Sequence, residues 1–262
     1  MSSKKEKLSC YLLTFNSSKY LEQIISPIRD VIDDLLVVDS GSTDRTEEIV
    51  ANLGGRFIYR ALDNFVNQRQ FAIDQCNHRW VLYLDSDEVP DGELARALAE
   101  LKAAGFTFNG RPYEAFRIKR RWFVLGKEVR VYYPISSPDY PVRLFNREVV
   151  GFAHEKKNVH ETIGGFESAA RLDGSVRHYS IESVDELKNK MELYTSLAAV
   201  DLKNKGRRGN WPAVIGHSIA AWFKWYIAKS GWKDGAAGFI LGKYAFNYTF
   251  LKYYKLMRSR DK

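Results

Sequence analysis

Three carboxylates follow a short apolar run at residues 80–84, in the order Asp85, Asp87 and Glu88. Packing does not account for them, because crowded carboxylates repel one another unless a cation offsets their charge. In an open α/β sheet ligands bind beyond the carboxyl ends of the strands, and Mg²⁺ or Mn²⁺ prefers carboxylate oxygens together with substrate phosphates. The segment therefore predicts a divalent metal site. The alternative is an acidic helix start, in which Asp87 or Glu88 caps the turn before Asp91.

Polar residues also follow two other apolar runs. Asp39 and then Ser42 and Asp44 come after one run, and Thr14 and Asn16 end the first run of the chain. Asp39 stands where a carboxylate could accept hydrogen bonds from a ribose or a base, and the turn after it could direct backbone N–H groups at an anion. Ser42 and Asp44 are equally good caps for the next helix. Together the three run ends predict one binding crevice at the edge of a sheet.

The elements that must position these residues alternate between apolar runs and helical patterns, which is typical of βαβ units. The expected strands are 8–15, 35–38, 57–59 and 80–84, and the expected helices are 19–32, 43–52, 65–77 and 91–104. This rhythm predicts an α/β fold with a Rossmann-like, mostly parallel sheet and helices on both faces. Further strands are expected at 115–124 and 142–145, with a surface loop at 134–141 between them.

The remaining residues, 181–262, predict a helical C-terminal extension. Its expected helices are 183–203, which Ser183 and Glu186 would start as a capping box, 213–229 and 236–257. Residues 203–262 carry 13 Lys or Arg against 2 acids and four of the six tryptophans, whereas residues 1–202 have a net charge of −3. Interleaved basic and aromatic residues suit an anionic membrane surface. The alternatives are a helical subdomain packed on the sheet and a homo-oligomer interface.

Composition excludes several classes of protein. With 262 residues, 45% hydrophobic and 27% charged, the chain is typical of a soluble folded protein and too long for a disulfide-stapled miniature. Cys10 and Cys76 lie in apolar runs without metal-ligand spacing, which excludes a zinc ribbon and favours a reducing compartment. Residues 1–7 are polar and show no secretory signal. The expected location is therefore the cytoplasm.

The order of the motifs resembles the family 2 glycosyltransferases of the GT-A fold, in particular the WaaE/KdtX-like branch of lipopolysaccharide-core glucosyltransferases. The matching motifs are Thr14-x-Asn16, the turn from Asp39 to Asp44, the D-x-D element Asp85 to Asp87, Pro141-Val-Arg143-Leu-Phe, Val159-His160-Glu161 and His178-Tyr179. The D-x-D element alone is a weak signal, but the ordered set is specific and covers about residues 8–180.

The resemblance implies roles for the donor-binding residues. Asp39 would contact the uridine of a UDP-sugar, and Thr14 would lie beside the base. Asp85 would face the ribose or the metal ion, and Asp87 would hold that ion, Mn²⁺ or Mg²⁺, on the diphosphate. The donor site would also include Asn16, Ser42 and Asp44. By this reading residues 1–180 form the GT-A domain, with a nucleotide-sugar half at about 1–104 and an acceptor half at about 105–180.

The same resemblance makes Glu161 the expected catalytic base. It would deprotonate the acceptor hydroxyl as that oxygen attacks the anomeric carbon from the face opposite the leaving diphosphate, which inverts the configuration. A neutral His160, or Asp87 and Glu88, are poorer candidates for this task.

Several basic residues keep alternative interpretations. The family's usual Gln-Lys-Asn on the third helix is Gln-Arg-Gln here, so Arg69 could still meet a phosphate; likewise Ser17 replaces the usual Glu after Asn16 and removes a carboxylate near the donor. Arg143 could bind the diphosphate or pair with a surface acid. His178 could be a third metal ligand or an ordinary hydrogen-bonded histidine. The basic run 119–121 could approach an anionic acceptor or be a solvated strand edge.

These observations predict a metal-dependent, inverting glycosyltransferase that moves a hexose, glucose by resemblance, from a UDP-sugar to a lipopolysaccharide-core or other lipid-linked saccharide. An alternative enzyme would act on polyprenyl phosphate. A nucleic-acid-binding module built on the basic extension would leave the polar strand ends unexplained, so no nucleic-acid partner is expected. The enzyme is expected on the inner face of the cytoplasmic membrane, held there peripherally through its C-terminal helices.

Overall fold

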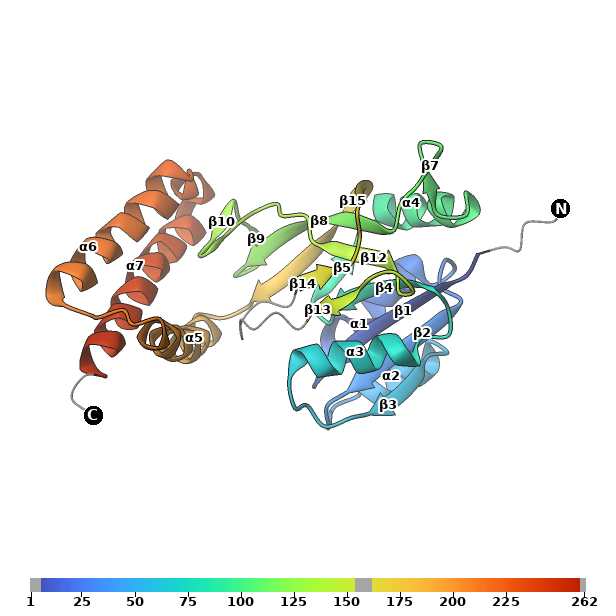
Figure 1. Ribbon diagram of the computed structural model, residues 1–262, viewed down its shortest axis with the longest axis horizontal. Coiled ribbons are helices and arrows are strands. Elements are labelled where there is room, and N and C mark those ends of the chain that lie inside the picture. The colour runs from blue at the N-terminus through green and yellow to red at the C-terminus, as the bar shows by residue number, and fades with distance from the viewer. Residues whose placement is uncertain (1–5, 154–161, 260–262) are drawn as a thin grey trace. The chain divides into compact units, whose positions relative to one another are not determined.

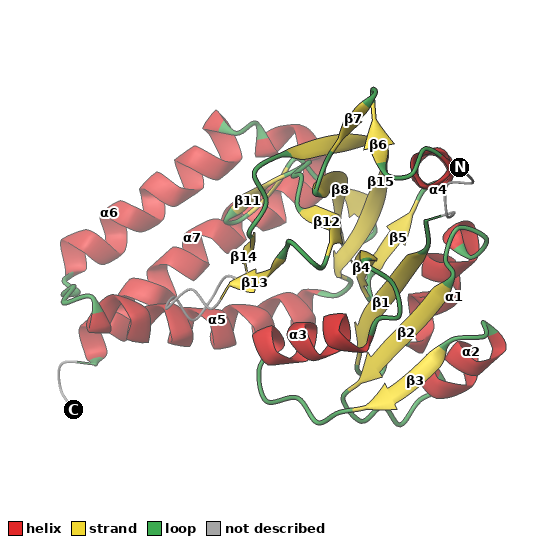
Figure 2. Cartoon of the chain, turned by 45° about the vertical axis from the view of Figure 1, so that its right-hand side comes forward, coloured by secondary structure: helices red, strands yellow, loops and turns green. Residues whose placement is uncertain are grey.

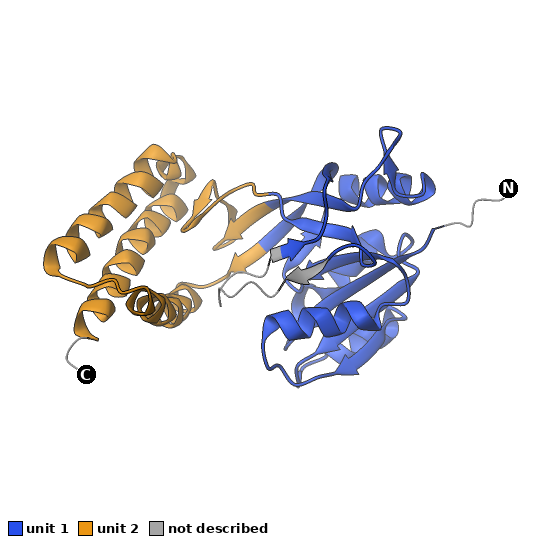
Figure 3. Cartoon of the chain, viewed as in Figure 1, with its two compact units in different colours: residues 1–120, 140–178 blue, residues 121–139, 179–262 orange. Residues whose placement is uncertain are grey.

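The computed structural model describes residues 6–153 and 162–259. The chain forms two compact units, which Figure 3 shows in blue and orange. Unit 1 comprises residues 1–120 and 140–178, and unit 2 comprises residues 121–139 and 179–262. Two long strands, β8 (Ala115–Val124) and β15 (Ala169–Ile181), begin in unit 1 and end in unit 2.

The expected βαβ repeats form the first half of unit 1. Their strands and helices are β1 (Leu8–Thr14), α1 (Ser18–Ile25), β2 (Asp34–Asp39), α2 (Thr46–Asn52), β3 (Arg56–Tyr59), α3 (Phe65–Gln75) and β4 (Trp80–Asp85), with a 3-10 turn at Ser26–Ile28. The strands lie in the order β3-β2-β1-β4, and all three neighbouring pairs are parallel (Figure 1). The carboxyl ends of β1, β2 and β4 therefore share one edge of the sheet, as the α/β prediction requires.

Beyond β4 the sheet contains antiparallel pairs. The order continues through β12 (Val142–Asn146), β8, β15 and β5 (Glu88–Pro90), and β9 (Lys127–Glu128) pairs with β8. The nine-stranded sheet is therefore mixed: β12 is antiparallel to both β4 and β8, and β5 is antiparallel to β15. Glu88 lies in a strand rather than at a helix start, because the following helix, α4 (Gly92–Ala103), is capped by the side chain of Asp91.

Helices cover both faces of the parallel strands, as Figure 2 shows: α3 lies on one face, and α1 and α2 lie on the other. On the α3 face, Tyr11, Val38 and Tyr83 pack against Ala72 and Cys76. Alternation along each strand makes this possible, since successive side chains point to opposite faces. Three small two-stranded sheets complete the strands: β6 (Thr107–Phe108) with β7 (Arg111–Pro112), β10 (Val131–Tyr132) with β11 (Ile135–Ser136), and β13 (Gly151–Ala153) with β14 (Thr162–Gly164).

Unit 2 contains the predicted C-terminal helices: α5 (Val184–Asn204), α6 (Trp211–Trp222), continued by a π-helix at Phe223–Ala228, a 3-10 turn at Gly231–Asp234, and α7 (Gly235–Arg258). The helix starts follow their sequence signals: Ser183 accepts a hydrogen bond from the Glu186 amide, and Asn210 accepts one from the Ala213 amide. At Gly238 a Cβ atom would lie 1.9 Å from the carbonyl oxygen of Gly231, so only glycine fits there. Within the described residues, each helix is too short or too polar to cross a membrane.

Candidate active site

The polar residues after β1 and β2 form one hydrogen-bonded pair of loops. Asp39 is buried, and its carboxylate accepts hydrogen bonds from the Thr14 hydroxyl (2.7 Å), the Gly41 amide (2.8 Å), and the Ser42 amide and hydroxyl (2.7 and 2.5 Å). Burial alone would raise the pKa of Asp39, but these donors outweigh it and lower the pKa. Asp39 is therefore an ionised group that orders the turn. Its contact with a uridine stays a prediction.

The same loops are tied together by Asn16, Ser42 and Asp44. The Asn16 amide donates to the Ser42 hydroxyl (2.7 Å), and the Asn16 side chain accepts from the amide of Thr43 (2.8 Å). Asp44 accepts from the amide of Ser18 (3.0 Å), the first residue of α1. Hydrogen bonds from Thr46 and Ser18, acting against slight burial, lower the pKa of Asp44 to about 2. The expected donor-binding residues at these two strand ends therefore form hydrogen bonds within and between the two loops.

The end of β4 holds a cluster of paired charges. Asp85 lies between two guanidinium groups, 2.8 Å from Arg69 of α3 and 2.8 Å from Arg143 of β12. Glu88, completely buried in β5, lies 2.5 Å from Arg143 and 3.1 Å from Arg120 of β8. The two arginines hold the pKa of Asp85 well below its usual range against the effect of burial, and the carboxylates raise the pKa of Arg143 well above its usual range. Each buried charge therefore has a partner, as buried charges require.

This cluster corrects one step of the sequence argument. Crowded carboxylates do need positive charge, but here arginines from α3, β8 and β12 supply it to Asp85 and Glu88. Arg143 pairs with Asp85 and the buried Glu88 rather than with a surface acid. Arg120, in the basic run 119–121, pairs with Glu88 and is therefore not a solvated strand-edge residue. Local sequence could not show these pairs, since their partners come from strands far apart in the chain.

The cluster rests on an aromatic platform that the sequence argument missed. The Arg143 guanidinium lies 4.4 Å from the ring centroid of Tyr83, and that of Arg69 lies 5.0 Å from it. Tyr11 stacks on the same ring at 5.6 Å. Cation–π attraction of this kind favours guanidinium groups over an aromatic face. In the sequence Tyr83 is an ordinary aromatic residue of an apolar run, and nothing in that run indicates this contact.

Asp87 and His178, two of the predicted metal ligands, lie next to each other. The strand pairing of β5 and β15 sets His178 opposite Glu88, and the His178 Nε2 atom lies 3.2 Å from the Asp87 Oδ2 atom. Gly174 allows β15 to approach the start of α4, since a Cβ there would lie 2.2 Å from the Leu94 amide nitrogen. The carboxylate oxygen would suit either Mg²⁺ or Mn²⁺, but the imidazole nitrogen would suit Mn²⁺ better than Mg²⁺; the other ligands would come from substrate phosphates and water. Among the described residues no cluster of three or more metal-ligating side chains occurs.

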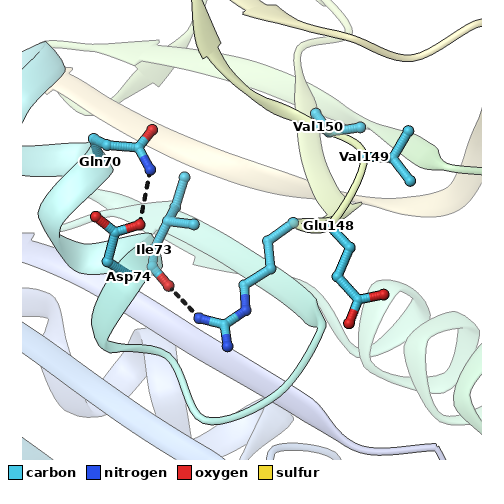
Figure 4. A pocket seen from close by; sticks show the side chains of 7 residues that line it. Gln70, Ile73, Asp74, Glu148, Val149 and Val150 are labelled. Carbon is cyan, nitrogen blue, oxygen red and sulfur yellow. Dashed lines mark hydrogen bonds between the residues drawn. The ribbon is translucent and has the colours of Figure 1, made fainter.

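Two other features bear on the prediction. Glu161, the expected base, and His160 lie outside the described residues, so their roles stay predictions. A cavity of about 400 Å³ lies elsewhere in unit 1, between α3 and the turn after β12 (Figure 4). Among its lining residues, Arg147 donates a hydrogen bond to the Ile73 carbonyl (2.7 Å), and Gln70 donates one to Asp74 (2.9 Å). The predicted donor-site residues do not line this cavity.

The parallel strands with polar ends and the antiparallel edge form the mixed α/β sheet that the motifs require. The chain belongs to glycosyl transferase family 2, whose sequence profile matches residues 9–158. It is therefore a glycosyltransferase, and the resemblance read from the motifs is confirmed at the level of the family.

Named relatives extend over nearly the whole chain. An uncharacterized glycosyltransferase of Rickettsia prowazekii is 27% identical, covering 98% of this chain and 87% of its own length. The lipopolysaccharide core biosynthesis glycosyltransferase LpsC of Rhizobium meliloti is 29% identical, covering 94% of this chain and 90% of its own. Among solved structures, S. aureus TarS is 17% identical with a TM-score of 0.46, covering 97% of this chain and 91% of that chain. Glucosyl-3-phosphoglycerate synthase of Mycobacterium tuberculosis, in complex with Mn²⁺, UDP and phosphoglyceric acid, is 18% identical with a TM-score of 0.46, covering 70% of this chain and 74% of that chain.

Proposed function

We propose that the chain is a metal-dependent, inverting glycosyltransferase that transfers a hexose, with glucose as the first candidate, from a UDP-sugar to a lipopolysaccharide-core or other lipid-linked saccharide. The relative LpsC, by its name, acts in lipopolysaccharide core biosynthesis. The observation that carries the proposal is the approach of Asp87 to His178 beside the charge cluster at the end of β4.

The balance of charge at this site supports metal dependence. Asp85 and Glu88 already offset much of the charge of Arg69, Arg120 and Arg143. A nucleoside diphosphate brings further negative charge, which the paired arginines alone would neutralise poorly. A divalent ion held by Asp87 and His178 would stabilise the negative charge of the departing diphosphate.

The chain's own residues would orient the two substrates. Arg69 and Arg143 pair with Asp85, whose carboxylate would face the ribose or the metal ion. Asp39 and the loops that it orders would receive the uridine. Glu161 would accept the proton of the acceptor hydroxyl while that oxygen bonds to the anomeric carbon and the bond to the diphosphate oxygen breaks.

The domain limits and the location belong to the same proposal. Residues 1–180 would form the catalytic domain, with the donor half at 1–104, and residues 181–262 would be the extension. The extension would hold the enzyme peripherally on the inner face of the cytoplasmic membrane, where a lipid-linked acceptor is presented. A homo-oligomer is the competing use of the extension, and polyprenyl phosphate is the competing acceptor.

Calorimetric titration with UDP, ADP and GDP, with and without Mn²⁺, tests the donor site. We expect Mn²⁺-dependent binding of UDP, and we expect Asp87→Asn or His178→Gln to weaken it at least about tenfold, because each removes one protein ligand. Asp74→Asn on α3 is the matched control and should bind UDP like the wild type. An affinity for UDP that changes neither with Mn²⁺ nor with the Asp87→Asn substitution would rule out the metal site.

The base is tested separately. Glu161→Gln should keep UDP binding and lose transfer by about 100-fold or more, the usual contribution of a general base. Transfer from UDP-glucose to lipopolysaccharide core, with polyprenyl phosphate as the alternative acceptor, is the measurement. Full transfer by the Gln variant would remove Glu161 from the mechanism.

A further inference from the structure

The outward side of α6 and its π-helical continuation is apolar. Trp211, Ile215, Ile219, Phe223 and Ile227 follow one another at intervals of four residues and are all exposed; together they are called the α6 stripe. Residues four apart lie on the same side of a helix. The small residues beside them, Pro212, Gly216, Ala220 and Ala228, are exposed as well, so the apolar surface extends along the helix.

The inward side of the same helix is also apolar, except for one serine. Val214, Ser218 and Trp225 are buried there. The Ser218 hydroxyl donates a hydrogen bond to the Val214 carbonyl of the same helix (2.6 Å). An ordinary surface helix exposes its polar residues and buries its large apolar ones. Here a serine faces inward while Ile219 and Phe223 are 55% and 57% exposed. A contiguous apolar surface of this kind marks an interaction site.

The charges around the stripe identify its partner. From Lys203 to Lys233 the chain contains seven Lys or Arg and no Asp or Glu. Four of these cations precede Trp211, and the other three lie at the opposite end, at Lys224, Lys229 and Lys233, all exposed. Both ends of the stripe therefore present positive charge. A two-fold pairing of the stripe with a second copy would bring like charges together, whereas an anionic lipid surface offers apolar depth and negative headgroups at once.

We propose that the α6 stripe is the membrane-docking face of this enzyme, which lies in the plane of an anionic bilayer with Ile215, Ile219 and Phe223 inserted below the headgroups. Lys224 and Lys233 each lie 5.4 Å from a tryptophan ring, over Trp225 and Trp232, as cations do when their stems follow apolar surface up to the headgroups. The inference rests on the proposed function only in that a lipid-linked acceptor would lie at the same surface.

Vesicle cosedimentation of the full chain is the test. The probes are vesicles of phosphatidylcholine alone and of phosphatidylcholine mixed with phosphatidylglycerol. We expect binding to the anionic vesicles alone, weakened by salt. Ile219→Glu should reduce the partition coefficient about tenfold or more, since it replaces one inserted apolar side chain with a charge. Val184→Glu, at an exposed apolar position that starts α5, is the matched control and should bind like the wild type.

Several outcomes would overturn the assignment. They are a wild type that stays in the supernatant of anionic vesicles, equal binding by Ile219→Glu and Val184→Glu, and a dimer by light scattering that Ile219→Glu converts to a monomer without any vesicle binding. Ile219→Ser serves as a second variant if the charged one does not fold. Calorimetry with UDP on the same preparations separates the two proposals, because the donor site is formed by residues outside the α6 stripe. Loss of UDP binding would count against the proposed function and leave the vesicle result standing.

Discussion

Unit 1 and unit 2 depart from the usual distribution of residues in opposite ways. Unit 1 buries charge, with Glu88 and Arg143 only 0% and 4% exposed, and unit 2 exposes large apolar side chains along α6. Buried charge is tolerated in unit 1 because each group has an oppositely charged partner within hydrogen-bonding distance. In unit 2 the apolar side chains of the α6 stripe are exposed and are not covered by other described residues. Such a surface indicates an external partner.

The largest effect is expected from breaking the buried charge cluster. Glu88→Ala leaves Arg120 without this partner and Arg143 with Asp85 alone, and it should lower the free energy of unfolding by about 3–5 kcal/mol. Urea denaturation is the measurement. Glu48→Ala is the control, because Glu48 pairs with Arg45 on the surface of α2, where both side chains are exposed, and it should change little. Equal effects of the two substitutions would mean that burial adds nothing to the cluster.

A pair of neighbouring residues sharpens the comparison inside unit 2. Val214 is fully buried and Ile215 is 49% exposed on the same helix. Val214→Ala should lower the free energy of unfolding by about 2 kcal/mol, because it leaves a cavity. Ile215→Ala should change it by less than about 0.5 kcal/mol. A large loss from Ile215→Ala would show that the stripe serves folding rather than docking.

A smaller effect concerns acid. Asp39, Asp44 and Asp85 all have pKa values below their ordinary range in the folded chain. A carboxyl group whose pKa is lower in the folded than in the unfolded chain stabilises the folded state at pH values above its unfolded pKa, near 4. This stabilisation is lost as the pH falls toward the folded pKa, which is about 2 for Asp44. The free energy of unfolding should therefore fall across this window. Asp44→Asn should make the fall shallower in urea titrations at several pH values, and an unchanged slope would contradict the role of Asp44.

The smallest expected signal is an absence of reaction. Cys10 and Cys76 are both buried in unit 1, and burial is the main cause that raises the pKa of Cys76 to about 12. Neither thiol should react with a disulfide reagent until urea unfolds the chain, after which both should. Rapid reaction of either thiol in native buffer would mean that the core of unit 1 opens more readily than its packing indicates.

The sequence predicted the elements with a strong local signal and missed the contacts that depend on distant pairing. Strands β1, β2 and β4 follow from their apolar runs, and the start of α5 follows from Ser183 and its cap. Strand β5 could not be predicted in this way, because Glu88 lies in a strand only through its pairing with β15, which is distant in the sequence.

The site shows the same division. Asp85 and Asp87 could be identified from their position after a strand, but the roles of Tyr83 and Arg120 depend on α3, β8 and β12 meeting at one point. A guanidinium group and a metal ion answer the same electrostatic requirement. Sequence alone therefore could not distinguish the arginines that neutralise Asp85 from the ion expected at Asp87.

The position of Trp211 gives the protein an optical reporter. This indole is exposed at the first turn of α6, and Trp232 is exposed beyond the end of that helix, whereas Trp80, Trp122 and Trp225 are buried. Buried indoles already emit in apolar surroundings, so transfer of the stripe from water to lipid changes the emission of Trp211 and Trp232 above all. Their blue shift, and their quenching by brominated acyl chains, would report how deep the start of α6 and the 3-10 turn at Gly231–Asp234 lie, without any added label.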